Sequence, residues 1–284
     1  MLKLTDTHLH LLAPDRFTYA WCKGLPALEK TFSIKDAADA ANQAKGGAVI
    51  AKSIFMEVDV GEHQQLAEAA HFGAQADDPA NTLEGVIASG RPESAGFGDH
   101  LEKLLENPHV RGIRRILHTS PDSVSDTALF CDHLRLLPRF GYSFDLCVLE
   151  RQLAIAARLA DQCPQTQFIL DHCGNPNVAA GAIGPWRTAL LEVAKRPNIV
   201  CKISGITVTA DPQKPLAAQL RPYVEHSIGA FGWDRVVWGS DFPVCNLTFN
   251  LAAWLDATSE ILAGESAANV EKLASGNAKR IYGV

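Results

Sequence analysis

The chain alternates between short apolar runs and longer segments with apolar residues at helical spacing. Short apolar runs bounded by turn residues predict buried strands, whereas apolar residues three or four positions apart predict amphipathic helices. The segments that predict strands are 4–11, 48–57, 82–90, 110–118, 143–148, 167–172, 198–205 and 235–239. The segments that predict helices are 34–45, 64–71, 98–106, 127–137, 150–161, 186–195, 220–231, 251–262 and 267–274.

Two helix boundaries carry their own signals. Ser33 precedes the first helical segment and is a favourable N-cap residue. Pro222 is tolerated only in a first helical turn, because proline lacks the N–H that an interior turn requires. The helix that contains it is therefore predicted to begin at Leu220.

Each predicted strand is followed by helical sequence, which is typical of parallel sheets with crossover helices. Eight such units predict a (β/α)8 barrel in a single domain spanning residues 1–284. A doubly wound open sheet has the same local pattern and stays open as an alternative. No Pro- or Ser-rich linker divides the chain, and neither G-x-G-x-x-G nor G-x-x-x-x-G-K-[ST] occurs, so no phosphate-binding loop is predicted.

Two histidines stand two positions apart in the first predicted strand. Side chains of a strand alternate between its faces, so His8 and His10 are expected to share one face with Asp6. A strand buried on both faces is normally apolar, and a polar stripe needs partners that offset its loss of hydration. The candidate partners follow two later strands and are Asp171, His172 and Asp241.

Functional side chains of a (β/α)8 barrel lie at the C-terminal ends of the strands. The polar residues predicted at this rim are His8, His10, Glu57, Arg114, His118, His172 and Asp241. Imidazole and carboxylate groups can bind Zn²⁺ or a similar ion and leave a position for water. The predicted ligand set is His8, His10, His172 and Asp241, with Asp241 accepting the proton of the attacking water.

The histidines and Asp241 also have structural interpretations. His8 and His10 can form a hydrogen-bonded pair in a polar layer of the barrel, and Asp171 can fix His172 in the core. A lone aspartate before a turn, as Asp241 is before Pro243, commonly caps that turn. The combination of these residues favours a functional site.

The sequence allows two roles for each of the cationic residues near the predicted rim. Arg114 can bind the paired oxygens of a carboxylate or a hydroxyl-rich substrate, or it can pair with a neighbouring acid. Lys52 and Lys202 share this ambiguity. Cys173 is interpreted as a small buried residue rather than as a nucleophile.

A long loop at residues 12–33 carries the aromatic residues Phe17, Tyr19, Trp21 and Phe32. Such a loop beside a polar strand end predicts a lid or pocket wall. Tyr19 and Trp21 are therefore predicted to contact the substrate together with Arg114 and His118.

Composition narrows the function classes. A formal net charge of -6 and a pI near 5.9 give no general attraction to nucleic acid or to anionic lipid. The seven cysteines are scattered without a C-x-x-C pair, which argues against a disulfide framework and a zinc–cysteine site. No signal peptide or membrane-spanning run is evident. A cytoplasmic protein with a small-molecule substrate is expected, and neither a monomer nor a homo-oligomer is favoured.

Five motifs, in order, resemble the amidohydrolase superfamily and most closely its lactone-hydrolase branch, which includes sugar-lactone hydrolases and 2-pyrone-4,6-dicarboxylate lactonases. The motifs lie at Asp6–His10, Arg111–Arg114, Asp171–Pro176, Cys201–Gly205 and Gly239–Val244, and the resemblance extends to Gly276–Gly283. The resemblance implies a distorted (β/α)8 barrel that hydrolyses a cyclic ester.

The resemblance also implies roles for individual residues. Asp241 would be the general base, and the histidines His8, His10 and His172 would polarise the lactone carbonyl directly or through one divalent ion. Arg114 would hold substrate oxygens. The bridging lysine and two further histidines of binuclear members have no clear equivalent, and the branch includes members that look metal-independent. Glu57 could complete a mononuclear site, although no motif places it there.

The leading functional prediction is hydrolysis of a sugar-acid lactone to the aldonate. The nearest enzyme alternative is a metal-dependent decarboxylase of a carboxylated aromatic or muconate-type acid, because that related branch shares the same histidines and aspartate. A barrel retained only for binding or as a scaffold is the third possibility. The presence of His8, His10, His172 and Asp241 argues against it.

Overall fold

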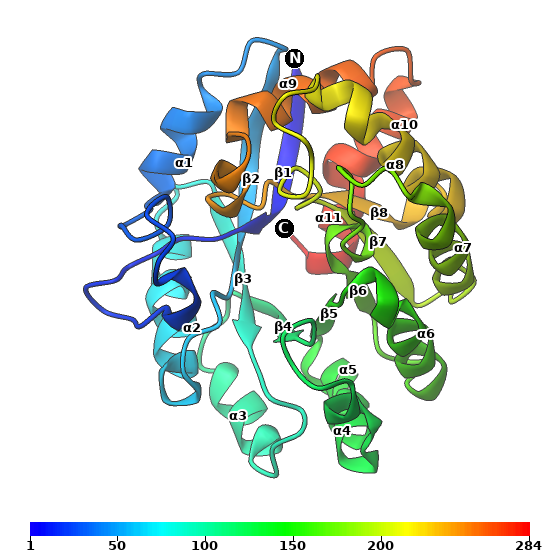
Figure 1. The fold of residues 1–284 in the computed structure, drawn as a ribbon. Coiled ribbons are helices and arrows are strands. Elements are labelled where there is room, and N and C mark those ends of the chain that lie inside the picture. Colours follow the sequence, from blue (N-terminus) through cyan, green and yellow to red (C-terminus); the bar gives the residue numbers. More distant parts are fainter.

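The computed structural model describes residues 1–284 and contains one sheet of eight parallel strands that follow one another in chain order. The strands enclose a barrel with helices around its outside (Figure 1). The strands are β1 (Leu2–Leu9), β2 (Ala48–Met56), β3 (Leu83–Ser89), β4 (Val110–Ile116), β5 (Ser143–Cys147), β6 (Phe168–Leu170), β7 (Ile199–Ile203) and β8 (Val236–Trp238). The predicted distorted (β/α)8 barrel is confirmed, and the doubly wound sheet is excluded because β1 adjoins β8.

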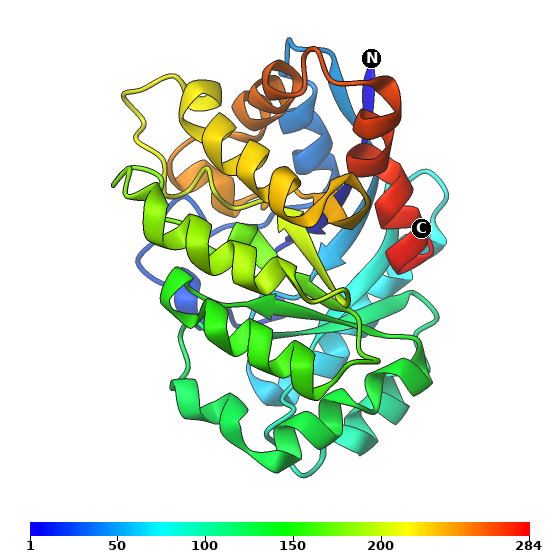
Figure 2. The same cartoon turned by 90° about the vertical axis from the view of Figure 1, so that its right-hand side faces the viewer.

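The helices form the outer layer, with α6, α7 and α8 side by side on one flank (Figure 2). Their bounds are α1 (Ile34–Ala41), α2 (Gln65–Gly73), α3 (Phe97–Leu104), α4 (Ala128–Leu134), α5 (Leu137–Phe140), α6 (Leu153–Gln162), α7 (Ile183–Ala194), α8 (Leu216–Phe231), α9 (Leu251–Ile261), α10 (Ala267–Glu271) and α11 (Asn277–Tyr282). Ser33 caps α1 as predicted, since its hydroxyl accepts the N–H of Asp36 at 3.2 Å. None of the helices has the length and apolar character to cross a bilayer.

The seam between β1 and β8 closes through a few specific hydrogen bonds rather than a regular ladder. The hydroxyl of Thr7 donates to the Trp238 carbonyl at 2.8 Å. Two backbone bonds follow beyond the strand ends, from Asp241 N–H to the His8 carbonyl at 2.9 Å and from His10 N–H to the Phe242 carbonyl at 2.8 Å. The first and last strands are thereby joined at the residues predicted to do chemistry.

Asp6 also fastens this seam. Its Oδ1 accepts the backbone N–H groups of His8 at 3.0 Å and Ser240 at 2.7 Å. The register of β1 shifts between Asp6 and Leu9, which interrupts the strict alternation of side chains. Asp6 therefore contributes to the backbone of the seam and not, as its spacing predicted, to the surface that the two histidines present.

The barrel interior contains two layers of different chemistry. An apolar layer consists of Ile54, Met56, Ile87, Ile169, Val200 and Val237, and Ala278 and Tyr282 of α11 pack against it. Asp171 and Lys202 stand two positions after Ile169 and Val200, so the strand period places them one layer nearer the C-terminal rim. A layer of buried charge therefore lies directly beneath the rim.

Several predicted helix boundaries are wrong: α1 ends at Ala41 and α7 begins at Ile183, and three further differences have clear physical causes. Helix α8 begins at Leu216, so Pro222 lies inside it, and the burial of Leu216, Ala217 and Leu220 offsets the missing backbone hydrogen bond. The predicted helix 127–137 ends early, since α4 stops at Leu134 and a separate short helix, α5, begins at Leu137 with Pro138 in its first turn. The last helical region does not stop at Ala274 but continues through a wider turn at Lys272–Gly276 into α11.

Strand β6 is shorter than predicted and ends at Leu170. The chain turns sharply at once, and His172 and Cys173 adopt left-handed conformations with φ of 56° and 53°. His172 therefore lies on a turn after the strand and not at its last position. Sequence period alone cannot detect such a turn, since non-glycine residues rarely adopt positive φ.

Candidate active site

A cavity of about 290 Å³ opens at the C-terminal ends of the strands. Its walls consist of His10, Trp21, Val58, Asp59, Arg114, Ile116, His118, Thr119, His172, Asn175, Gly205, Val208, Thr209, Asp241 and Val244. Six of the predicted site residues are among them: His10, Trp21, Arg114, His118, His172 and Asp241. Two others, His8 and Glu57, are buried beside this wall, with 0% and 1% of their surfaces exposed.

His8 and His10 lie together beside Asp241. Their Nε2 atoms are 3.2 Å apart, and Asp241 Oδ1 lies 3.7 Å from His8 Nε2 and 3.5 Å from His10 Nε2. The other nitrogen of His10, Nδ1, contacts the Met56 carbonyl at 3.0 Å, which fixes the ring so that Nε2 faces Asp241. The spacing of two residues in the sequence thus produces a convergent pair of imidazoles.

His172 completes this cluster from the opposite side of the barrel. Its ring centroid lies 4.5 Å from that of His8, and its Nδ1 contacts the Ser204 hydroxyl at 2.9 Å. Gly205 allows this approach, since a Cβ at that position would lie 2.2 Å from His172 Nδ1. Gly205 also has a φ of +65°, so any other residue there would be strained as well.

Asp241 is held in an unusual backbone conformation. Its φ is 56°, a left-handed value that non-glycine residues adopt infrequently. The hydrogen bond of its N–H across the seam and that of its carbonyl to the Cys245 N–H at 2.8 Å maintain this conformation. Such strain clusters at functional sites, and here it presents a carboxylate to the two imidazoles.

A network of buried charges supports the histidines from below. Asp171 Oδ2 accepts from Arg114 Nε at 3.0 Å, and Asp171 Oδ1 lies 3.1 Å from Lys202 Nζ and 3.5 Å from His8 Nδ1. Burial opposes ionisation of Asp171, but the charges of Lys202 and Arg114 outweigh it and hold the pKa of this carboxyl well below its ordinary value. A carboxylate that stays ionised can orient His8 at neutral pH.

Arg114 is paired on two sides. Besides Asp171, its Nη1 lies 3.2 Å from Glu57 Oε1, and its Nη2 lies 3.3 Å from Cys147 Sγ. Of the two interpretations that the sequence left open for Arg114, the structure supports pairing with neighbouring acids, because two carboxylates already neutralise this side chain. Lys202 behaves alike, being fully buried between Asp145 and Asp171, whereas Lys52 is a surface residue 3.4 Å from Glu84.

The two aromatic residues that were predicted to contact the substrate lie in different places. Trp21 lines the cavity, and its Nε1 donates to the Val58 carbonyl at 3.0 Å. Tyr19 is 8% exposed, packs against Phe17, and accepts the Ala13 N–H on its hydroxyl at 3.1 Å. Tyr19 is absent from the cavity wall, so its position gives no support to the predicted substrate contact.

Burial favours the neutral form of two histidines, His8 and His172. It lowers the pKa of His8 well below its ordinary value and lowers the pKa of His172 as well. Both imidazoles are therefore neutral near neutral pH. The neutral form is the one that binds a metal ion or donates a single hydrogen bond to a carbonyl oxygen.

The same cluster fits a divalent cation. Ligand atoms of His8, His172 and Asp241 all lie within 4.8 Å of one another, and His10 Nε2 borders this group. Two ligands about 2.1 Å from a shared ion are separated by roughly 3.0–3.4 Å, which agrees with the 3.2 Å between the Nε2 atoms of His8 and His10. Cys147, in a second such group, is less suitable because burial raises the pKa of its thiol to about 12.

Several residues of this site escaped the sequence analysis. Asp145 stands in the apolar strand β5, and a lone charge in a buried strand was a usable signal. Ser204, which holds His172, lay inside a recognised motif without an assigned role. Asp59 lines the cavity in a left-handed conformation that no sequence pattern indicated.

His118 lines the cavity, with its Nδ1 3.0 Å from Cys147 Sγ. Burial, followed by the charge of Arg114, lowers its pKa to about 4. Between about pH 6.5 and pH 4, the unfolded chain therefore binds a proton at His118 that the folded chain does not bind. As the pH falls through this range, the proton favours the unfolded chain and the contribution of His118 to stability is lost. The melting temperature of His118→Asn is expected to fall less over this range than that of the unmodified protein.

Thermal unfolding at pH 7.5, 6, 5 and 4.5 provides this comparison. The other buried histidines are present in both proteins, so the difference between the two curves isolates His118. Parallel curves would contradict the assignment. His63→Asn, at an exposed position, serves as the matched control and should leave the pH dependence unchanged.

Comparison with other proteins places the chain among known relatives. A protein from Sinorhizobium fredii is 28% identical over 302 residues, covering 100% of this chain and 99% of that protein. An L-fucono-1,5-lactonase from Burkholderia multivorans is 33% identical over 187 residues, covering 61% of this chain and 62% of the relative. One from Burkholderia ambifaria is 31% identical over 159 residues, covering 55% and 54%.

Solved structures agree with this placement. An amidohydrolase from Burkholderia multivorans with bound zinc superimposes with a TM-score of 0.86, at 26% identity and 99% coverage of both chains. A probable 2-pyrone-4,6-dicarboxylic acid hydrolase from Acinetobacter baumannii shares the fold, with a TM-score of 0.77 at 15% identity and 99% coverage of both chains.

The family assignment rests on most of the sequence. The amidohydrolase family model matches residues 5–284, from the first histidine-bearing strand to the C-terminal residue. The match includes every motif on which the resemblance was based and the whole of the cavity described above. The chain belongs to the amidohydrolase family.

Proposed function

We propose that this protein is a lactone hydrolase that opens a neutral sugar-acid lactone to the aldonate. The observation that carries the proposal is the convergence of His8, His10 and His172 on Asp241 at the edge of a cavity without an available cationic side chain. The Burkholderia relatives named L-fucono-1,5-lactonase support the same reaction class.

The cavity favours a neutral, hydroxylated ring. Arg114 is its only lysine or arginine, and Glu57 and Asp171 already pair with it. A substrate carboxylate would therefore lack a free cationic side chain as its partner. Hydroxyl groups, by contrast, find both donors and acceptors among the side chains Thr119, Asn175 and Thr209.

The residues of the chain can divide the hydrolysis between them. Asp241 accepts a proton from water, whose oxygen adds to the lactone carbonyl carbon. With the Ser204 hydroxyl donating to His172 Nδ1, His172 Nε2 carries the proton and donates to the carbonyl oxygen as that oxygen gains charge. The ring C–O bond then breaks, and the departing oxygen takes the proton held on Asp241.

Alternatively, His8, His10, His172 and Asp241 would hold a divalent ion, as the fit of the cluster indicates, and His172 Nε2 would then be a ligand instead of a proton donor. When bound, such an ion supplies a Lewis acid that polarises the carbonyl and lowers the pKa of water. The zinc in the Burkholderia multivorans amidohydrolase supports a site for Zn²⁺ in this chain.

A pH-indicator assay on a panel of neutral aldono-1,4- and aldono-1,5-lactones, including L-fucono-1,5-lactone, tests this function. The panel also contains 2-pyrone-4,6-dicarboxylate and a carboxylated aromatic acid, with carbon dioxide measured for the latter. We expect hydrolysis of at least one neutral lactone. Loss of that activity in chelator, with recovery on added Zn²⁺, would assign the histidines as ligands, whereas activity that survives chelation would assign them to direct polarisation.

Inactivity on all neutral lactones would contradict the proposal. Release of carbon dioxide from the aromatic acid would then establish the decarboxylase alternative. Hydrolysis of the pyrone dicarboxylate in preference to neutral lactones would contradict the substrate class while leaving the reaction class intact.

A further inference from the structure

Asp59 is a cavity residue for which the hydrolysis described above provides no role. It lies three residues beyond the end of β2, lines the cavity wall and keeps 30% of its side-chain surface exposed. Its φ is 50°, in the left-handed region that aspartate adopts only with support from its surroundings. The backbone is therefore locally strained at the residue that places this carboxylate in the wall.

Two contacts hold Asp59 in this conformation. Its backbone N–H donates to Glu57 Oε2 at 2.8 Å, and Glu57 is itself bound to Arg114. Its Oδ1 accepts from Arg91 Nη2 at 3.0 Å. The second carboxylate oxygen, Oδ2, has no hydrogen-bond partner within the protein and remains able to accept one.

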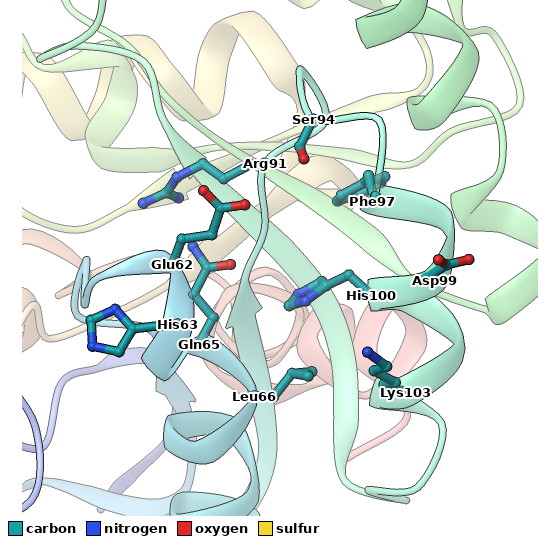
Figure 3. Close-up of a pocket in the computed structure, with 11 residues that line it drawn as sticks. Glu62, His63, Gln65, Leu66, Arg91, Ser94, Phe97, Asp99, His100 and Lys103 are labelled. Carbon is teal, nitrogen blue, oxygen red and sulfur yellow. The ribbon is translucent and has the colours of Figure 1, made fainter.

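Arg91 provides a rigid anchor for this carboxylate. Its side chain is 17% exposed, and its Nη1 donates to the Ser89 hydroxyl at 3.1 Å. Arg91 also lines a separate outer hollow of about 330 Å³, together with Glu62, Asp99, His100 and Lys103 (Figure 3). Arg91 therefore stands between the outer hollow and the catalytic cavity, and it fixes Asp59 from the side away from the substrate.

We infer that Asp59 is a specificity-determining residue, whose free carboxylate oxygen accepts a hydrogen bond from a hydroxyl of the neutral lactone and whose charge disfavours carboxylated lactones. The inference rests on the proposed function and names the feature of the substrate that the enzyme selects. A carboxylate is a strong acceptor for a hydroxyl, and a site built to bind a hydroxyl discriminates against analogues that lack it.

The charges of the wall explain the exclusion. The positive charge of Arg91 partly compensates the negative charge of Asp59, but Arg91 is not among the residues that line the catalytic cavity. Within that cavity, Arg114 is neutralised by Glu57 and Asp171, which leaves the carboxylates of Asp59 and Asp241 to face the substrate. A substrate carboxylate placed beside Asp59 therefore meets like charge, and no free cationic side chain of the wall compensates it.

The variant Asp59→Asn tests the inference. Asparagine adopts the left-handed conformation readily and can still accept from Arg91, so the fold is expected to persist. On the best neutral lactone, KM should rise by about 10-fold while kcat stays within about 3-fold, since a lost binding contact remote from the reacting carbonyl acts mainly on binding. The inhibition constant of 2-pyrone-4,6-dicarboxylate should fall by about 10-fold, because a repulsive charge is removed.

Asp99→Asn is the matched control. It removes the same charge from the outer hollow, where Asp99 lies on α3 (Figure 3). Its KM and inhibition constant should equal those of the unmodified enzyme. A neutral lactone lacking one hydroxyl provides a second check, because for the analogue that lacks the contacted hydroxyl Asp59→Asn should no longer raise KM.

The outcomes separate the inference from the proposed function. An unmodified enzyme that hydrolyses neutral lactones, with a variant whose KM and inhibition constant are unchanged, would overturn the role of Asp59 alone. A large loss of kcat with unchanged KM would also overturn it, since Asp59 would then position the catalytic groups. An unmodified enzyme inactive on every neutral lactone would overturn the proposed function, and this inference with it.

Discussion

Replacing Asp241 with asparagine is expected to reduce kcat by about 10³-fold, within the range of roughly 10²–10⁴ for loss of a general base. Asparagine preserves the volume of the side chain and tolerates the left-handed backbone of this position, but it cannot accept the proton of the attacking water. Thermal unfolding should change little, because the seam hydrogen bonds of Asp241 are formed by its backbone. Steady-state kinetics on the best lactone of the panel, together with a melting curve, provide the measurement.

Asp132→Asn is a suitable control for this substitution. Asp132 is an exposed residue that pairs with Arg135 on the outer surface, so the same chemical change there should leave turnover intact. If Asp241→Asn retained turnover within 10-fold of the unmodified enzyme, the base would have to be another group, and the assignment of Asp241 would be wrong.

Replacing Lys202 with methionine is expected to destabilise the fold by about 3–5 kcal/mol, the usual effect of removing one partner from a buried ion pair. Lys202 is fully buried, and its ammonium group lies between Asp145 and Asp171. Its charge helps to keep the pKa of Asp171 well below the ordinary value, so its loss leaves Asp145 without a cationic partner and Asp171 with Arg114 alone. Urea unfolding followed by circular dichroism measures the change.

A second substitution distinguishes charge from packing. The double variant Lys202→Met with Asp145→Asn removes the carboxylate that has lost its cationic partner and should recover part of the lost stability. Lys52→Met is the matched control, because Lys52 pairs with Glu84 at the surface and such pairs contribute about 0–1 kcal/mol. Equal effects of Lys202→Met and Lys52→Met would show that the buried network does not stabilise the protein.

The elements that depend on local sequence were predictable. The Ser33 cap is a bond between residues three positions apart, and the strands follow from apolar runs that stay buried whatever their neighbours. The pairing of His8 with His10 likewise follows from their spacing of two residues at the end of β1. In each case the interaction is fixed by residues close together in the chain.

The elements that depend on distant contacts were not predictable. Pro222 is tolerated inside α8 because neighbouring elements bury the turns before it, and no local rule contains that packing. Arg114 is neutralised by Glu57 and Asp171, and each of these lies 57 positions away from it in the sequence. Left-handed backbone at Asp59, His172 and Asp241 arises from loops that the whole barrel holds in place.

The seam between β1 and β8 has a consequence for the order in which the protein can become active. His8 and Asp241 come from the first and last strands, and the hydroxyl of Thr7 reaches a carbonyl 231 residues later. A nascent chain on the ribosome therefore carries its first strand, with two histidines that lack their partners, until the residues of the last strand have been made. Contacts of such long sequence separation form late, so catalytic competence is expected to be the last property gained during folding.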